Sequence, residues 1–285
     1  MNRAEPMKNL NRNLIKTFQR GLKVLEEVCR RADGITQSEV ARSLDVNRST
    51  ALRYLATLEA EGYIGRSGEA LYRPTVKMAE LARTVIDSLE IKPFAHEQLE
   101  QLTGQSGFSS HLAVLSDRRI VYVDGEQAPG VVRVDADIGT AAPIHCSATG
   151  KALAAYIEPG ERKEVIACYL EGSTRFAAYT ARTISDPAGL EKEFAKIRAR
   201  GYAVDDEEYE PGVRCLAAPI FDSRSRVAAV IGISGTTVRL DLSAHPGLIH
   251  AICEAADSIS GAVGCSDPRG CRKVERAGAV KRPAE

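Results

Sequence analysis

Between Phe18 and Gly62, apolar residues recur at three- and four-residue spacing in three short segments, which polar residues separate. This spacing predicts a helix over 18–29, a second over about 36–44 and a third over about 48–61. Isolated helices of this length are marginal in water, so they must pack against one another to persist. The three short apolar segments therefore predict a small helical domain at the amino-terminal end of the chain.

Capping residues mark the ends of these helices. Thr36-Gln37-Ser38-Glu39 matches a capping box, in which the Thr and Glu side chains satisfy backbone N–H groups that would otherwise be unpaired. Asn47 is a favourable N-cap for the third helix, and Gly62 ends that helix. The stripes that we expect to be buried are Phe18, Leu22, Leu25, Val28 and Cys29 on the first helix, and Ala51, Leu52, Leu55 and Leu58 on the third.

Two short helices joined by a tight turn, the second with polar and basic residues at its start, match the helix-turn-helix arrangement. There the second helix enters the major groove, so hydroxyl and guanidinium groups of its first turns contact phosphates and base edges. Two short strands over 63–64 and 71–73 predict a β-wing. A small helical domain whose surface carries arginines by chance is the competing interpretation. The candidate DNA-binding residues are Thr36, Gln37, Asn47, Arg48, Ser49, Thr50, Arg53, Arg66 and Arg73.

Charge is distributed unevenly along the chain, although the totals cancel at 38 Lys and Arg against 38 Asp and Glu. Residues 1–78 hold 14 basic and 9 acidic residues, a net charge of +5, whereas 79–267 hold 18 and 27, a net charge of −9. Residues 268–285 hold 6 and 2, a net charge of +4. A basic amino-terminal segment followed by an acidic segment is expected when one domain contacts phosphate and the other does not.

Length and composition exclude several classes of protein. The 285 residues suffice for about two domains with cores of their own, and 44% hydrophobic residues place the chain outside the disordered class. The apolar runs are far shorter than the roughly 20 residues of a membrane span, and the polar start lacks a secretory signal, so we expect a cytoplasmic protein. Seven scattered cysteines without a Cys-x-x-Cys pair predict reduced, mostly buried thiols.

The remaining sequence mixes strand and helix patterns, which indicates an α+β domain. The expected elements, in chain order, are a linker helix over 75–89, a helix from Pro93 to Gly104, a hairpin over 109–115 and 120–123, a strand over 131–138, a helix over 147–156, a helix opened by Asp186-Pro187 and closed at Gly201, strands over about 213–221 and 226–234, and a helix over about 246–263. The tail over 265–285 has few large apolar side chains, and we expect it to lack fixed structure.

Several segments resemble the IclR family of transcriptional regulators. In the first third they are LDVNRSTALRYL at 44–55 and LEAEGYI at 58–64. In the second half they are HCSATGKA at 145–152, RGYAVDDEE at 200–208 and EPGVRCLAAPI at 210–220. Covering residues 17 to about 264, the resemblance implies two domains: an N-terminal, otherwise all-α winged helix-turn-helix and, after a linker helix, a C-terminal α+β effector-binding domain of GAF-like fold. The implied boundaries are 14–74, 75–91 and 92–264, followed by the tail at 265–285.

The segment 147–150 begins a helix, where free backbone N–H groups and the helix dipole favour an anion such as a small carboxylate. The IclR resemblance implies that this helix start holds the effector together with an Asp, a Cys and a Ser from the two later segments and the last strand. Gly232 stands where members that recognise glyoxylate-like acids have a further Ser, so we expect space for a bulkier acid, including an aromatic one. The effector-binding residues carried over are Ala148, Thr149, Asp205, Cys215 and Ser234.

Fragments of catalytic motifs are present but incomplete. Residues 148–152 resemble the end of a phosphate loop, yet His145 stands where Gly is needed and the metal-binding hydroxyl is absent. Residues 232–236 resemble a nucleophile elbow whose second Gly comes one residue early. His145 with Cys146 as a base and nucleophile, and His245 with His250 as metal ligands, lack an accompanying motif. We therefore expect no catalytic residue, no metal and no cofactor.

The predicted function is a DNA-binding transcriptional regulator that controls a catabolic operon in response to a small organic acid. The expected partners are double-stranded operator DNA, the acid, and a second copy of the chain in a dimer that is often paired into a tetramer, as the resemblance implies. The alternative is a metabolite-binding or enzymatic α+β domain with an incidental helical appendage. Salt-sensitive, sequence-selective duplex binding distinguishes the two.

Overall fold

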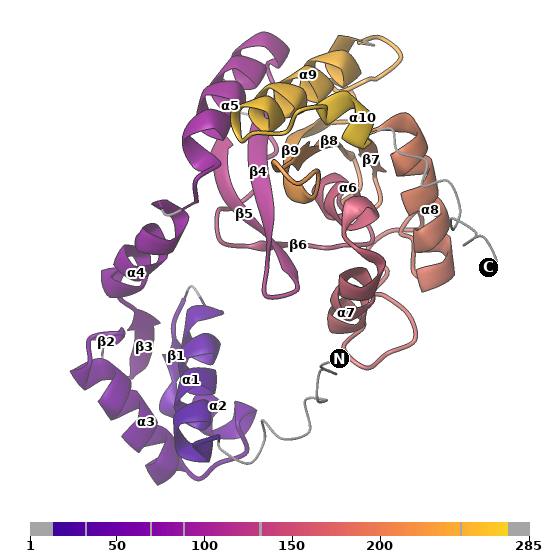
Figure 1. Cartoon of the computed structure of the whole chain (residues 1–285). Coiled ribbons are helices and arrows are strands. Elements are labelled where there is room, and N and C mark those ends of the chain that lie inside the picture. The colour runs from indigo at the N-terminus through magenta and orange to yellow at the C-terminus, as the bar shows by residue number, and fades with distance from the viewer. Residues whose placement is uncertain are drawn as a thin grey trace, which may run out of the picture. The chain divides into compact units, whose positions relative to one another are not determined.

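The computed structural model describes residues 14–31, 33–68, 70–87, 89–130, 133–245 and 247–272 (Figure 1). The chain divides into two units between residues 88 and 89. Among the described residues, no helix combines the length and the apolar character needed to cross a membrane. Each unit has its own hydrophobic core.

The amino-terminal unit confirms the three expected short helices and the β-wing. Its three strands form an antiparallel sheet in the order β1-β3-β2, in which Ile64–Ser67 pairs with Leu71–Pro74. The sequence did not predict β1, whose two residues pair with Leu71 and Tyr72. The elements are α1 (Lys16–Cys29), β1 (Ile35–Thr36), α2 (Gln37–Ser43), α3 (Arg48–Ala60), β2 (Ile64–Ser67), β3 (Leu71–Pro74) and α4 (Val76–Asp87).

The buried face of α1 differs from the stripe that its spacing predicts. Val24 and Val28 are fully buried, whereas Phe18 and Leu22 are 66% and 44% exposed. On α3, Ala51 and Leu55 are buried as expected, but Leu52 is 39% exposed. Periodicity shows that a helix has an apolar face, but it does not show which of two neighbouring faces packs against the core. Helix α1 carries apolar residues on both of these faces.

The carboxy-terminal unit is built on a six-stranded antiparallel sheet in the order β6-β5-β4-β9-β8-β7. The central strands β4 and β9 are more than a hundred residues apart in sequence yet pair side by side. The expected hairpin and the two late strands are therefore confirmed. The strands are β4 (Ser109–Ser116), β5 (Arg119–Glu126), β6 (Ala141–Ala142), β7 (Ala203–Asp206), β8 (Val213–Phe221) and β9 (Val227–Thr236).

Helices cover both faces of this sheet (Figure 1). Leu112, Leu216 and Ile231 point toward α5 and α9, and the alternate residues Ala113 and Val230 belong to the core that contains α6, α7 and α8. Three layers result, with the effector-site candidates on the α6 side. The helices are α5 (Lys92–Ser106), α6 (Ala148–Tyr156), α7 (Pro159–Leu170), α8 (Pro187–Arg200), α9 (Gly247–Ala262) and α10 (Pro268–Arg272).

Two expectations for this unit are wrong. The strand expected over 131–138 does not form at 133–138, while 131 and 132 lie outside the described residues, and the sheet edge is instead β6. Helix α5 passes through Gly104 and ends before Gly107, whose positive φ of 70° forms the C-cap. The sequence also failed to predict α7 and β7.

The sequence predicted a tail without fixed structure from residue 265 onward, but the structure continues as α10 to Arg272. Arg272 is buried, and its guanidinium donates to the carbonyl of Cys253 at 2.9 Å and to Asp257 at 2.7 Å. The hydroxyl of Tyr156 donates to the Arg272 carbonyl at 2.6 Å. These bonds fix α10 even though few large apolar side chains are available, and residues 273–285 lie outside the described residues.

Candidate DNA interface and effector site

The capping box that starts α2 is present in full. The Thr36 hydroxyl accepts from the backbone N–H of Glu39 at 3.3 Å, and the Glu39 carboxylate accepts from the Thr36 N–H at 2.8 Å. The Thr36 N–H, together with the Thr36 hydroxyl that donates to the same carboxylate at 2.7 Å, lowers the pKa of Glu39. Gln37 donates to the Arg48 carbonyl at 2.8 Å, which ties the start of α2 to the start of α3.

The first turn of α3 presents polar side chains on a fixed backbone. Asn47 accepts from the Thr50 N–H and from the Ser49 hydroxyl, both at 2.8 Å. Arg48, Ser49 and Arg53 are exposed, and Thr50 is half-buried. The structure thus brings the helix-turn-helix candidates together at one helix start.

The two wing arginines already have partners within the amino-terminal unit. Arg66 on β2 pairs with Glu59 at 3.3 Å, and its guanidinium lies 5.4 Å from the ring centre of Tyr72. Arg73 on β3 donates to the Asp33 carbonyl at 3.0 Å. These contacts hold both arginines to the unit, although each side chain remains exposed.

Polar residues of the expected effector site form one row across neighbouring strands. Ser234 on β9 lies opposite Cys215 on β8, which lies opposite Asp205 on β7. On the other side of β9, Ser234 lies opposite Ser109. Residues directly opposite in an antiparallel sheet share a face, so all four point to the α6 side.

The start of α6 faces this row. The Ser147 hydroxyl caps the helix by accepting from the Gly150 N–H at 2.9 Å, and it donates to the Pro143 carbonyl at 2.7 Å. Thr149 and the hydroxyl of Tyr122 on β5 are hydrogen-bonded at 3.0 Å. Ala148 is buried in the apolar core of the same face. Thr149 therefore lies against the sheet face that carries the row, next to Tyr122 and Gly232.

Gly232 makes room for His111, and the expectation that it opens space for a ligand is wrong. His111 lies opposite Gly232 in the sheet, and a Cβ added to Gly232 would overlap the His111 Nε2 atom and lie 3.0 Å from Thr149 Cγ2. The imidazole is 3% exposed, meets the Tyr122 ring edge-to-face, and has Nδ1 3.4 Å from the Ser234 hydroxyl. Burial lowers the pKa of His111 to about 4, so the ring is neutral at neutral pH.

A buried ion pair lies beside Asp205. Lys151 of α6 is fully buried and donates to the Glu208 carboxylate. Asp205 accepts from the Glu208 N–H at 2.8 Å. Burial raises the pKa of Asp205 to about 7, against the opposing effect of this hydrogen bond and of Lys151. The same cause raises the pKa of Cys215 to about 12, so its thiol stays protonated and is not an activated nucleophile.

Sequence reasoning missed four side chains at this site: His111, Tyr122, Lys151 and Glu208. The period-two alternation in the hairpin places His111 on the same face as Ser109. This alternation would have assigned His111 to the site once the face of Ser234 was known. The Lys151–Glu208 pair joins residues 57 positions apart and carries no local signal. Together these groups place a neutral imidazole, a phenol hydroxyl and a buried ion pair beside one helix start.

Replacement of Gly232 by alanine is expected to destabilise the carboxy-terminal unit by about 1–3 kcal/mol, because the new methyl group overlaps His111 and Thr149. Urea unfolding followed by circular dichroism measures this change. Gly261→Ala on α9, where an added Cβ meets open space, is the matched control and should not lower stability. Equal stability of Gly232→Ala and the parent chain would contradict the packing described here.

Family models match both units of the chain. The model described as the IclR helix-turn-helix domain matches residues 17–68. The model described as the bacterial transcriptional regulator IclR C-terminal matches residues 83–261. The amino-terminal helices are therefore not an incidental appendage, in contrast to the alternative left open by the sequence.

Individual relatives agree with these models. The HTH-type transcriptional regulator XynR of Escherichia coli is 29% identical over 252 residues, which cover 88% of this chain and 98% of the relative. The transcriptional repressor IclR of the same organism is 31% identical over 229 residues, covering 79% and 82%. The crystal structure of the Thermotoga maritima IclR matches with a TM-score of 0.67 at 27% identity, over 88% of this chain and 100% of that one.

Proposed function

The chain belongs to the IclR family of bacterial transcriptional regulators, and we propose that it binds a near-palindromic operator and alters that binding in response to a small organic acid. The observation that carries the proposal is the start of α3, where the Asn47 cap fixes a turn that exposes Arg48, Ser49 and Arg53. Such a helix start offers hydroxyls and guanidinium groups to phosphates and base edges. We place this activity in the cytoplasm, where operator DNA lies.

An exposed apolar stripe supports the pairing of two amino-terminal units that we propose. Leu14, Ile15, Phe18 and Leu22 lie on or just before α1 and are all exposed. A contiguous apolar patch of this kind marks an interaction surface, and we assign it to a second copy of the chain. A two-fold dimer matches the symmetry of a near-palindromic operator, and two dimers pair in the assembly that we propose.

A small carboxylate suits the site between α6 and the sheet. The start of α6 supplies backbone donors and a favourable dipole, and hydroxyls of Thr149, Tyr122 and Ser234 surround it. Because His111 fills the space beside Gly232, the reason for expecting a bulky or aromatic acid is removed. A thermal-shift screen against small aliphatic and aromatic carboxylates tests the proposal, since an acid that binds the folded state raises the melting temperature. The absence of a shift with every acid would count against this site.

Replacement of Cys215 by leucine is expected to weaken the response to the effector by about tenfold or more while leaving operator affinity unchanged, because a larger side chain enters the row beside Ser234. Operator release by the acid, followed by fluorescence anisotropy, measures both quantities. Cys168→Leu on α7 is the control, since its partly exposed thiol is outside the row. An unchanged acid response in Cys215→Leu would remove Cys215 from the site.

Binding of the acid is expected to depend on pH through Asp205. With its pKa raised to about 7, this carboxyl is protonated below that pH and charged above it. A bound carboxylate favours the protonated form, so affinity should be constant below about pH 7 and fall by at most about tenfold per pH unit above it. His111 and Cys215 titrate far from this window, at about 4 and about 12.

Calorimetric titration of the acid across this range measures the effect. Asp205→Asn should retain binding with the pH dependence removed. Affinity that rises with pH in the parent chain would contradict the protonation assigned to Asp205.

A further inference from the structure

Two cysteines meet at the carboxy-terminal end of the second unit, away from the effector row. The Sγ atoms of Cys265 and Cys271 lie 3.7 Å apart, and neither cysteine is in a disulfide. A disulfide requires the sulfurs to approach to about 2.05 Å, which is a shift that side-chain rotation can supply when the backbones are already close.

Regular backbone structure holds both cysteines in place. Cys265 follows the end of α9, where its N–H donates to the Ser260 carbonyl at 2.8 Å. Asp267 caps α10 by accepting from the Gly270 N–H at 2.9 Å, and the Cys271 N–H donates to the Asp267 carbonyl at 3.0 Å. The one-turn helix therefore carries Cys271 back toward Cys265.

The residue after Cys271 anchors the helix to the rest of the unit. Arg272 bonds to Asp257 of α9 at 2.7 Å, and its carbonyl accepts from Tyr156 of α6 at 2.6 Å. These contacts oppose separation of the two sulfurs and keep their distance short.

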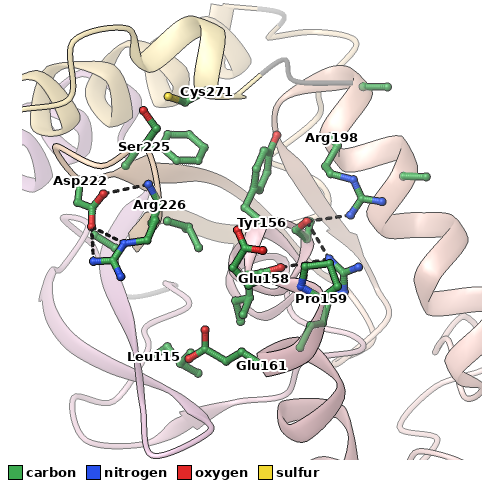
Figure 2. Close-up of a pocket in the computed structure, with 18 residues that line it drawn as sticks. Leu115, Tyr156, Glu158, Pro159, Glu161, Arg198, Asp222, Ser225, Arg226 and Cys271 are labelled. Atoms are coloured by element: carbon green, nitrogen blue, oxygen red, sulfur yellow. Dashed lines mark hydrogen bonds and ion pairs between the residues drawn. The ribbon is translucent and has the colours of Figure 1, made fainter. Parts of the chain in front are cut away.

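The two thiols differ in their access to solvent. Cys271 is partly exposed and lines a cavity of about 1030 Å³ that also includes Tyr156, Ser225 and Arg226 (Figure 2). Cys265 is buried, and this burial raises the pKa of its thiol. A small oxidant that enters the cavity therefore reaches Cys271 first, with Cys265 directly behind it.

We propose that Cys265 and Cys271 form a reversible disulfide, a modification site outside the effector pocket, with a low-molecular-weight disulfide such as oxidised glutathione as the oxidant. The Cys271 thiolate attacks the small disulfide, forms a mixed disulfide and releases one thiol. The Cys265 thiolate then attacks the Cys271 sulfur, which closes the internal bond and releases the second thiol. Two protein thiols are oxidised, one small disulfide is reduced to two thiols, and the two protein protons pass to those thiols.

The disulfide would act as a reversible modification and would add little to the stability of the fold. Only five residues separate the two cysteines, and a loop this short removes little chain entropy from the unfolded state. Its local effect is to join α10 to the end of α9 and so to fix the wall of the cavity that Cys271 lines.

The test is to incubate the full-length chain with excess oxidised glutathione, quench it with acid, and count thiols after denaturation. The thiols of Cys265 and Cys271 should both disappear, in addition to any glutathione adduct at the exposed Cys29, and a reducing agent should restore them. Trypsin cuts after Arg269, between the two cysteines, so the bonded form yields two linked peptides that separate on reduction. Retention of all seven thiols, or a stable glutathione adduct without the internal bond, would overturn the proposal.

Matched variants assign the bond to this pair. Cys271→Ser and Cys265→Ser should each form no internal bond, whereas Cys253→Ser should still form the bond between Cys265 and Cys271. Cys253 is the necessary control because it lies on α9 and on the same tryptic peptide as Cys265. Loss of the bond in Cys253→Ser would show that Cys253 is the true partner. Circular dichroism of each variant confirms that it is folded.

Discussion

Replacement of Lys151 by methionine is expected to destabilise the carboxy-terminal unit by about 3–5 kcal/mol. Lys151 is fully buried and donates to Glu208, whose second carboxylate oxygen has no hydrogen-bond partner among the residues that the structure describes. Methionine preserves the aliphatic stem but leaves the Glu208 carboxylate buried without its cation, close to Asp205. Urea unfolding of the full chain, followed by circular dichroism, measures the loss.

Lys196→Met is the matched control for this substitution. Lys196 on α8 also pairs with a glutamate, Glu193 at 3.4 Å, but its side chain is 70% exposed. Solvent screens such a pair, so the variant should lose less than about 1 kcal/mol. If Lys151→Met unfolds at the same urea concentration as the control, the buried ion pair does not support the fold.

Replacement of Arg53 by alanine is expected to weaken operator binding by about 1–3 kcal/mol, or roughly 5- to 150-fold. Arg53 is exposed on α3, one turn after the capped start of the helix. Its loss removes a guanidinium from the surface assigned to the major groove and leaves the buried Ala51 and Leu55 untouched. Fluorescence anisotropy with labelled operator measures the affinity.

Arg30→Ala provides the comparison for Arg53→Ala. Arg30 follows α1, is exposed and pairs with Glu26 and Glu27, and it lies outside α2 and α3. The same loss of one positive charge should then change operator affinity much less. An operator affinity in Arg53→Ala equal to that of Arg30→Ala would remove Arg53 from the DNA contacts.

Features set by short-range chemistry are the ones that the sequence predicted correctly. The capping box at Thr36 and Glu39 and the Asn47 cap are present as expected. Pro187 begins α8 and Gly201 ends it with a φ of 86°. Each of these depends on residues within four positions of one another, so the chain folds locally as its local sequence indicates.

Features set by distant partners could not be predicted in this way. Which face of α1 is buried depends on what packs against it, and Phe18 and Val24 are equally apolar in sequence. The two residues of β1 form a strand only because β3 lies beside them. Which side chain occupies the space at Gly232 depends on the pairing of β4 with β9, because this pairing places His111 opposite Gly232.

For the effector site, the family resemblance supplied residues that the local sequence could not. The structure places Asp205, Cys215 and Ser234 in one row, although they are carried by three different strands. Lys151 and His111, which lie beside this row, escaped notice because their burial depends on partners that are distant in the sequence.

Operator binding is tested most directly by selecting bound duplexes from a random pool with the full-length chain and titrating the enriched sequence with salt. A dimer of this chain should select two inverted half-sites whose centres are about one helical turn or a multiple of it apart. Its affinity for the selected duplex should fall linearly with salt on logarithmic axes. Recovery of no preferred sequence, together with no duplex binding at low salt, would contradict the DNA-binding function proposed for this chain.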